Sequence, residues 1–290
     1  MAVYRGMDIG TAKPSEAERA EVPYHLADLV DPDEEYTVTL FQAAARAALK
    51  GISARGGKAL LVGGTGLYLR AVTDDLSFPG RFPSVAAGLT AALENLGPKG
   101  TDERLTGCAA LHARLDELDP VAAGRIEPGN ERRLVRALEV TLGSGQPFSS
   151  FGPGLERYPA SRTYLVGVQR EPEELDRRIA QRFSRLMDEG FLEEVRDLAS
   201  RPGGLSRTAR QALGYRELLS HIEDGVPLHA AVDEAVRRTR AFAKRQRAWF
   251  RRDPRIEWLD PEEDPVAFVA ERLDQDTGNS DGWNTVGPDR

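Results

Sequence analysis

The stretch that decides the fold is KALLVGGTGLYLRAV, residues 58–72. Residues 59–62 are an unbroken apolar run, and the glycine-rich turn at 63–66 leads into a second apolar run with helical character. An unbroken apolar run is typical of a parallel strand covered on both faces, whereas a half-exposed strand alternates. We therefore predict a strand at 59–62, a tight turn and then a helix.

Two neighbouring segments show the same alternation of helix and strand. Residues 37–57 place apolar side chains at helical spacing, with Thr37 or Thr39 as a cap and two glycines as a stop. Residues 164–168 predict a strand, and the helix predicted after it carries one apolar face made of Leu175, Ile179, Phe183 and Leu186. Strands that alternate with helices predict an α/β fold with a parallel sheet.

The middle of the chain is different. From about Pro79 to Ala160 strand signals disappear, and residues 110–126 and 130–145 have the pattern of amphipathic helices. The simplest organisation is a helical insert that interrupts an α/β core. We expect a first core part at 1–78, a helical insertion domain at 79–160, a second core part with a basic helix at 161–263, and a C-terminal helix with a disordered tail at 264–290.

Composition narrows the class of protein. Hydrophobic residues make up 40% and charged residues 29%, which is ordinary for a globular chain. Apolar runs fall far short of the roughly 20 residues that cross a bilayer, so we expect no membrane contact and a cytoplasmic location. Cys108 is the one cysteine and cannot form an internal disulfide. Neither it nor the four histidines show metal-ligand spacing, so we expect no structural zinc.

The most asymmetric segment is AVRRTRAFAKRQRAWFRRDP, residues 235–254. It carries eight Arg or Lys and no acid until Asp253, within a chain whose net charge is −7. Uncompensated like charges destabilise a helix, so a polyanionic partner such as RNA explains the segment better than a solvated face does. For the smaller cluster Arg132, Arg133 and Arg136, both interpretations stay open.

Two glycine-containing loops have the chemistry of anion sites. Gly63, Gly64 and Thr65 follow a predicted strand, where backbone N–H groups at a helix start can bind a phosphate. Gly10, Thr11 and Lys13 offer an amide, a hydroxyl and an ammonium group. A simple sharp turn and a solvated loop remain the alternatives. No segment matches the P-loop pattern GxxxxGK followed by Ser or Thr.

Six segments, taken in order, closely resemble the bacterial tRNA dimethylallyltransferases. They are VYRGMDIGTAKP, YHLADLVDPDEEYTV, LVGGTGLYLRA, RRLVRALEV, QALGYRE and AKRQRAWFRRDP, and the resemblance extends from Met1 to about Asp260. It implies that a dimethylallyl group passes from dimethylallyl diphosphate to N6 of the adenosine 3′ of the anticodon in tRNA. It also implies a fold like that of P-loop kinases, with an inserted helical domain that grips the anticodon stem-loop.

The resemblance also implies roles for individual residues. The implied tRNA contacts are Arg132, Arg133, Arg136, Arg240, Lys244, Arg245 and Arg247. The implied lining of the diphosphate channel is Gly10, Thr11, Lys13, Gly63, Gly64, Thr65, Arg210 and Gln211. Gln211 stands where some relatives carry an arginine against the diphosphate, and Arg210 or Arg207 would substitute for it. Mg²⁺ is the expected cofactor, held with the diphosphate, and the chain is expected to be a monomer.

The opening residues 1–14 match a family segment that follows the first strand, the P-loop and an Asp-Ser pair. The resemblance therefore implies that the general-base Asp and the P-loop lie upstream of Met1. On that basis we expect this chain to retain no catalytic residue or metal ligand and to be inactive as written. The alternative is a catalytically dead RNA-binding module. A small-molecule nucleotide kinase is a third interpretation, which leaves the basic helix unexplained.

Overall fold

The computed structural model describes residues 1–152, 154–161, 163–260 and 262–275. The chain divides into two compact units. Unit 1 comprises Met1–Asp74 and Ala160–Arg290, and unit 2 is the continuous segment Asp75–Pro159. The sequence prediction placed the insert at 79–160. The tail predicted to be disordered lies, from residue 276 on, outside the described residues.

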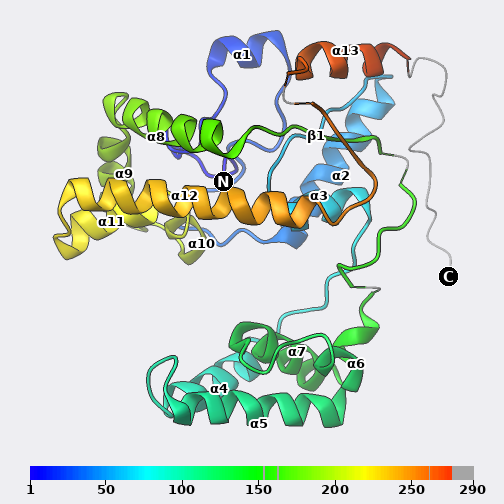
Figure 1. Cartoon of the computed structure of the whole chain (residues 1–290), viewed down its shortest axis with the longest axis vertical. Helices are drawn as coiled ribbons and strands as arrows, with labels where there is room; N and C mark the ends of the chain where they lie inside the picture. The colour runs from blue at the N-terminus through cyan, green and yellow to red at the C-terminus, as the bar shows by residue number, and fades with distance from the viewer. Residues whose placement is uncertain (153, 162, 261, 276–290) are drawn as a thin grey trace. The chain divides into compact units, whose positions relative to one another are not determined.

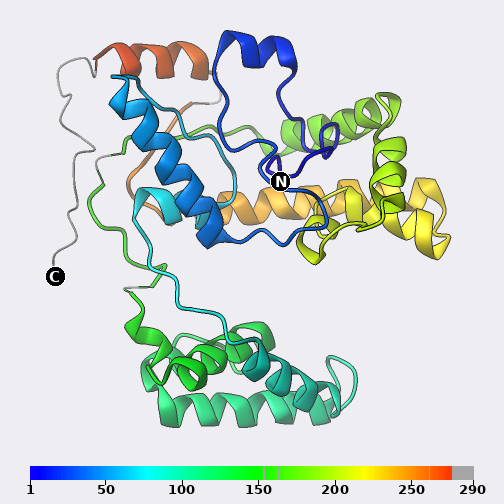
Figure 2. The same cartoon turned by 180° about the vertical axis from the view of Figure 1, so that it is seen from behind.

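Unit 1 is mostly helical and contains a small parallel sheet (Figure 1). Its first helices are α1 (Glu16–Glu21), α2 (Val38–Ala54) and α3 (Gly66–Thr73). After unit 2 come α8 (Pro172–Asp188), α9 (Phe191–Ser200), α10 (Arg207–Arg210), α11 (Tyr215–Asp224), α12 (Leu228–Phe250) and α13 (Pro265–Gln275). Figure 2 shows α2 beside α3, and these two helices pack together. Thr37 is the N-cap of α2, since its hydroxyl accepts a hydrogen bond from the Leu40 amide.

The sheet pairs β1 (Leu165–Gly167) with β2 (Ile256–Trp258) in parallel, with Val166 opposite Glu257. The prediction of a strand around 164–168 is thus confirmed, but that of a strand at 59–62 was wrong. Residues 59–62 make no backbone hydrogen bond to any described residue, and Leu60 and Val62 are 64% and 82% exposed. A strand exists through its hydrogen-bonded neighbours, so apolar composition alone did not produce one.

The core of unit 1 lies among α8, α9, α11 and the opening segment of the chain. Tyr4 and Met7 are fully buried, and they belong to the same apolar cluster as Phe191 and Tyr215. The rings of Phe191 and Tyr215 meet edge to face with centroids 4.9 Å apart, an arrangement that aromatic quadrupoles favour. The opening segment, although its sequence has the chemistry of a loop, is therefore part of the core.

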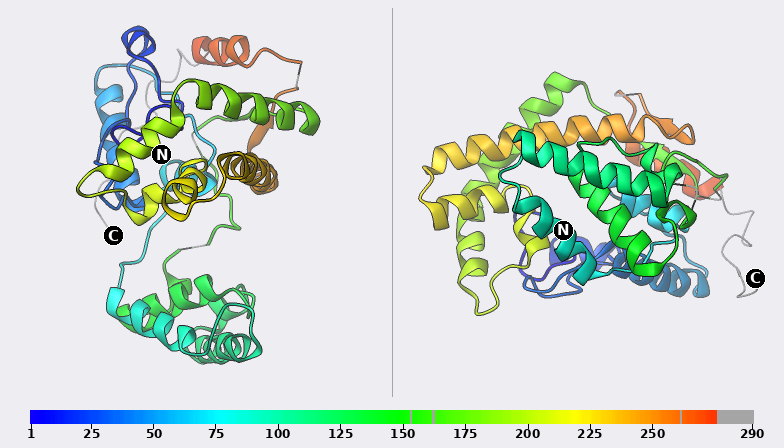
Figure 3. Two further views of the ribbon diagram at one scale, coloured as in Figure 1. Left: turned by 90° about the vertical axis from the view of Figure 1, so that its left-hand side faces the viewer. Right: turned by 90° about the horizontal axis from the view of Figure 1, so that it is seen from below.

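Unit 2 is helical throughout its regular structure. Its elements are α4 (Pro83–Glu94), α5 (Asp102–Leu118), α6 (Pro120–Ala123), α7 (Glu131–Ser144) and the 3₁₀ turn η1 (Phe148–Ser150). Helices α4, α5 and α7 pack on one another, and Figure 3 shows their ribbons from two sides. Leu115, Leu134 and Leu138 are buried in the core between them. Helix α7 ends at Gly145 in the left-handed conformation (φ +72°), which glycine adopts without steric cost.

Candidate functional site

The glycine-rich turn at 63–66 lies against helix α12. The Gln246 side-chain amide donates a hydrogen bond of 2.7 Å to the Gly64 carbonyl. A Cβ atom at Gly66 would lie 2.1 Å from the Trp249 ring, too close for any side chain. Two motifs separated by about 180 residues, the glycine turn and the basic helix, are therefore parts of one site.

The turn presents unpaired donors at the start of α3. Thr65 is the N-cap, but its hydroxyl does not cap the helix. Within the described part of the chain, the N–H groups of residues 63–67 have no hydrogen-bond partner. The first N–H groups of a helix carry partial positive charge and bind anions readily. The arrangement can therefore accept a phosphate or diphosphate beside α12.

The second predicted anion loop is satisfied from within the chain. The Glu194 carboxylate accepts hydrogen bonds from the backbone N–H groups of Asp8 (2.9 Å), Ile9 (2.6 Å) and Gly10 (3.3 Å). The Tyr215 hydroxyl donates to the same carboxylate at 2.5 Å. Burial and this contact with Glu194 raise the pKa of Tyr215 well above its usual value. Glu194 thus occupies the place that an anion would take in this loop.

The side chains of this loop also bond internally. The Thr11 hydroxyl donates to the Met7 carbonyl at 2.6 Å. The buried Lys13 ammonium donates to the Tyr4 carbonyl at 2.8 Å and to Asp28 at 2.6 Å, and it also pairs with Asp8. The role of Gly10, Thr11 and Lys13 in a diphosphate channel stays a prediction. Sequence reasoning missed Glu194, because it lies far along the chain from this loop.

Arg210 and Gln211 lie at the end of the short helix α10. Arg210 forms an ion pair with Glu223 of α11, and the side-chain oxygen Oε1 of Gln211 accepts a hydrogen bond from Arg216 at 3.4 Å. Arg207, at the start of α10, is exposed and has no partner among the described residues. Of the two arginines considered as substitutes at the Gln211 position, Arg207 is thus the one available to a ligand.

The cations of α12 fall into two groups. Arg237 and Arg238 both pair with Glu234 one turn earlier, which lowers the pKa of Glu234 to about 2, and Arg238 also pairs with Glu217. The expectation that the whole run is uncompensated was therefore wrong at this end, because acids upstream in the helix and on α11 neutralise it. Arg240 approaches Asp176 of α8, with 3.8 Å between Nε and the carboxylate.

Lys244, Arg245 and Arg247 form the second group. Their side chains have no ion pair or hydrogen bond to any described residue. They flank Gln246, which contacts the glycine turn. The uncompensated charge of α12 therefore lies in the turn of the helix that contains Gln246.

The predicted arginines of unit 2 lie on the first turns of α7. Arg132 and Arg133 are exposed and have no partner in the described part of this unit. Arg136 pairs with Glu139 at 2.9 Å and donates to the Pro79 carbonyl at 2.9 Å. Arg132 and Arg133 are thus available to a ligand, whereas Arg136 also holds the segment that leads into α4.

A buried ion network, which sequence reasoning missed, fixes the other end of α3. Asp74 accepts hydrogen bonds from Arg70 at 2.5 Å and from Arg255 at 2.8 Å, and Arg255 also binds Asp253 at 2.6 Å. Burial opposes ionisation of Asp74, but the two arginines outweigh it and hold its pKa below the usual range. The network joins α3 to the segment after α12, so α3 is held at both of its ends.

The family of the chain follows from comparison with known proteins. The family model described as IPP transferase matches residues 2–253. The chain belongs to the IPP transferase family. The tRNA dimethylallyltransferase of Kineococcus radiotolerans is 48% identical over 259 residues, which cover 89% of this chain and 78% of the relative. That of Desulforudis audaxviator is 44% identical over 263 residues, covering 91% and 82%.

Solved structures of the family agree with the fold. The tRNA isopentenylpyrophosphate transferase of Bacillus halodurans is 33% identical with a TM-score of 0.62, covering 94% of this chain and 86% of that one. A eukaryotic dimethylallyltransferase acting on tRNA superposes with a TM-score of 0.68 at 23% identity, covering 95% and 68%, which supports the fold alone. The α/β prediction and the family resemblance are both confirmed.

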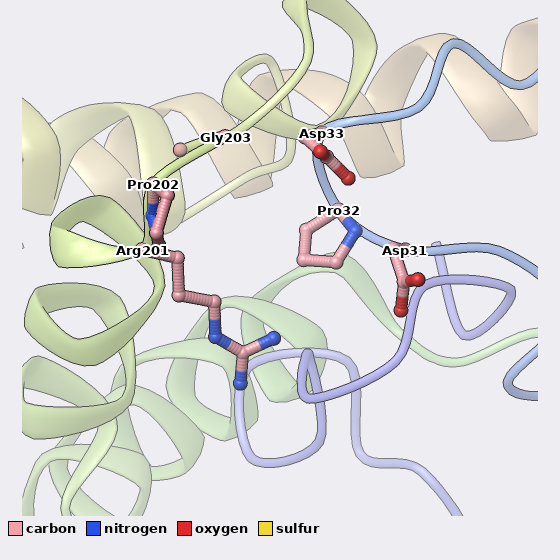
Figure 4. A pocket seen from close by; sticks show the side chains of 7 residues that line it. Asp31, Pro32, Asp33, Arg201, Pro202 and Gly203 are labelled. Carbon is pink, nitrogen blue, oxygen red and sulfur yellow. The ribbon is translucent and has the colours of Figure 1, made fainter.

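One hollow in the described part of this IPP transferase chain is lined by none of the predicted site residues. Figure 4 shows a hollow of about 240 Å³ lined by Asp31, Pro32, Asp33 and the loop from Arg201 to Gly204. Among the described residues, no cluster of three His, Cys, Asp or Glu can hold a metal ion. No described helix is both long and apolar enough to span a bilayer.

The residues near the glycine turn fit Mg²⁺ only in part. Protein-bound Mg²⁺ takes oxygen ligands and commonly keeps several waters beside one or two carboxylates and substrate phosphates. At this turn Thr65 supplies a hydroxyl oxygen. Asp74, at the far end of α3, is buried and bonded to two arginines, so it is not available as a ligand.

Proposed function

We propose that this chain acts in the transfer of a dimethylallyl group from dimethylallyl diphosphate to tRNA, at N6 of the adenosine 3′ of the anticodon. The observation that carries the proposal is the contact between Gln246 and Gly64. It joins a helix that carries free cations to a turn with unpaired amides, in a chain whose family model spans residues 2–253. RNA and a diphosphate would thus meet at one place.

The transfer reaction requires both a diphosphate site and an RNA-binding surface. The N6 nitrogen forms a bond to the allylic carbon, the bond from that carbon to the diphosphate oxygen breaks, and the nitrogen loses a proton. Donors aimed at the leaving diphosphate stabilise the charge that develops on it, and the amides of residues 63–67 are suited to this. The adenine must leave its stack to react, which costs a few kcal/mol. Contacts that bind the RNA tightly are therefore needed beside the diphosphate site.

The RNA grip is assigned to the free cations. Lys244, Arg245 and Arg247 would bind backbone phosphates next to the turn, and Arg132 and Arg133 of unit 2 would add contacts to the anticodon stem-loop. Arginine suits this role because its planar fork binds phosphate oxygens in pairs. Arg207 is the candidate for an additional contact to the diphosphate.

Three further points belong to the proposal. Mg²⁺ would enter with the diphosphate and supply charge neutralisation. The chain would act as a monomer. It would act in the cytoplasm, where its one cysteine, the buried and free Cys108, stays reduced.

The test combines binding with transfer. Binding of an unmodified tRNA transcript is measured at several salt concentrations. Transfer is followed with labelled dimethylallyl diphosphate and Mg²⁺, and a tRNA with guanosine at the target position is the control. Adenosine-dependent labelling supports the enzyme. Binding without labelling supports the RNA-binding module. A chain that neither binds the tRNA nor labels it overturns the proposal.

A further inference from the structure

Helix α8 carries arginines on the face that points away from the core. Ile179, Phe183 and Leu186 are buried in the apolar cluster of unit 1. The outer face carries Arg177, Arg178, Gln181, Arg182 and Arg185, all of them exposed. These five residues, which we call the α8 arginine face, line with Glu174 a shallow hollow of about 540 Å³. The function proposed above does not use this face.

Two of the four arginines on this face form ion pairs within the described part of the chain, and two do not. Glu174 forms ion pairs with Arg177 and Arg178. The side chains of Arg182 and Arg185 have no ion pair or hydrogen bond with any residue that the structure describes. The other acids of the helix stand at its ends, at Glu173 and Asp176 near its start and at Asp188 at its close. Its last turns therefore expose two unneutralised guanidinium groups on neighbouring turns.

Helix α8, which carries the α8 arginine face, is a neighbour of the basic helix α12. The two helices pack against each other within unit 1, and Figures 1 and 3 show them side by side. At the junction, Arg240 of α12 donates a hydrogen bond of 3.2 Å to the Asp176 carbonyl of α8. Arg240 therefore joins the two helices, and the α8 arginine face belongs to the same unit as the free cations of α12.

We propose that the α8 arginine face binds the phosphate backbone of the same tRNA, as an extension of the contact made by α12. The inference rests on the proposed function for the identity of the RNA. Arg178, Arg182 and Arg185 stand one turn apart and span about 10 Å along the helix axis, given a rise of about 1.5 Å per residue. Such a row follows successive phosphates of one strand without reading bases, because phosphate contacts fix position and carry no sequence information.

The test measures how tRNA affinity depends on salt. Each phosphate contact steepens the slope of log K against log salt by about 0.7 for single-stranded and about 0.9 for duplex nucleic acid. The double variant R182Q/R185Q should therefore reduce the slope by about 1.4 to 1.8. The loss of affinity between 50 and 200 mM salt should shrink correspondingly, by about tenfold. Neither side chain bonds to another described residue, so the thermal melting midpoint should not change.

The matched control is R196Q on α9, where the arginine is exposed but pairs with Glu193. It removes one positive charge from the same unit, half of what the double variant removes, and should leave the slope unchanged. A slope that R182Q/R185Q does not alter, while K244Q/R247Q lowers it, would overturn the α8 contact and leave the proposed function standing. An equal reduction by R196Q would also overturn it, since the effect would then be one of net charge. A wild-type chain that fails to bind tRNA would overturn both.

Discussion

Gln246 donates a 2.7 Å hydrogen bond to the carbonyl oxygen of Gly64, and through it the basic helix α12 holds the glycine turn that begins α3. Trp249, one turn further along α12, covers Gly66 so closely that a Cβ atom there would lie 2.1 Å from its ring. The anion-binding turn and the RNA-binding helix of the proposed site are therefore built as one rigid contact. Each helps to position the other.

Replacing Gly66 by alanine should disturb this contact. The added methyl group overlaps the Trp249 ring, and overpacking of this kind costs about 1–3 kcal/mol. Chemical denaturation should show that loss in the free energy of unfolding of unit 1. Gly51→Ala in α2 is the control, since its Cβ would meet only Arg55 at 3.5 Å. Alanine in a helix interior should instead stabilise by about 0.5–1 kcal/mol. Equal effects of the two changes would contradict the close approach.

Replacing Arg255 by leucine should be among the most destabilising changes in unit 1. It leaves Asp253 and one side of Asp74 buried without an arginine partner. Removing one partner of a buried pair typically costs about 3–5 kcal/mol. Urea unfolding would measure the change. Arg237→Gln breaks an exposed pair with Glu234 and should cost less than about 1 kcal/mol, so similar losses in both variants would count against the buried network.

The same network predicts how stability depends on pH. For Asp74 and Asp253, burial opposes ionisation, but hydrogen bonds led by those from Arg255 outweigh it and lower both pKa values. The stabilisation that the ionised forms of Asp74 and Asp253 provide is complete above a pH of about 3.9, the pKa of aspartate in an unfolded chain. It is lost as the pH falls through the lower pKa values of the folded state. The free energy of unfolding should therefore decrease as the pH is lowered from 5 toward 3. Asp74→Asn should make that decrease shallower, and an unchanged slope would refute the assignment.

Charge reversal on α12 should abolish RNA binding. The triple variant R240E/K244E/R247E places three acids along the surface that adjoins the glycine turn, and tRNA binding should fall below detection at 150 mM salt. The control R237Q/R238Q alters arginines that already pair with Glu234 and should keep most of the affinity. Filter binding or fluorescence anisotropy measures both. Equal tRNA affinities of the triple variant and the wild type would show that the cations of α12 are a solvated surface and do not bind RNA.

Residues 59–62 should exchange their amide hydrogens rapidly. Their N–H groups have no hydrogen-bond partner in the described part of the chain, and Val62 is 82% exposed. Hydrogen exchange followed by mass spectrometry should show this peptide near the intrinsic rate, whereas the middle of α2, around the buried Ala45, should be protected. Slow exchange at 59–62 would mean that these amides are paired in solution.

The helices of this protein are largely determined by the sequence. The stripe of Ile179, Phe183 and Leu186 predicted the buried face of α8. Thr37, one of the two threonines expected to cap α2, is its N-cap. Helical periodicity is a local property, because side chains three and four residues apart share a face whatever the rest of the chain does. The six family segments likewise identified the IPP transferase family before any geometry was known.

The tertiary structure alone decided which groups are free and which are neutralised. Residues 59–62 have strand composition but no strand, because pairing depends on a neighbour that local sequence does not supply. Glu194 fills the loop at 8–10, and Glu234 neutralises part of α12, so donors that look available in sequence are already bonded. Ion pairs and backbone contacts between distant segments depend on the folded path of the chain. That path left Lys244, Arg245 and Arg247 unpaired, and it brought Gln246 of the same helix to Gly64.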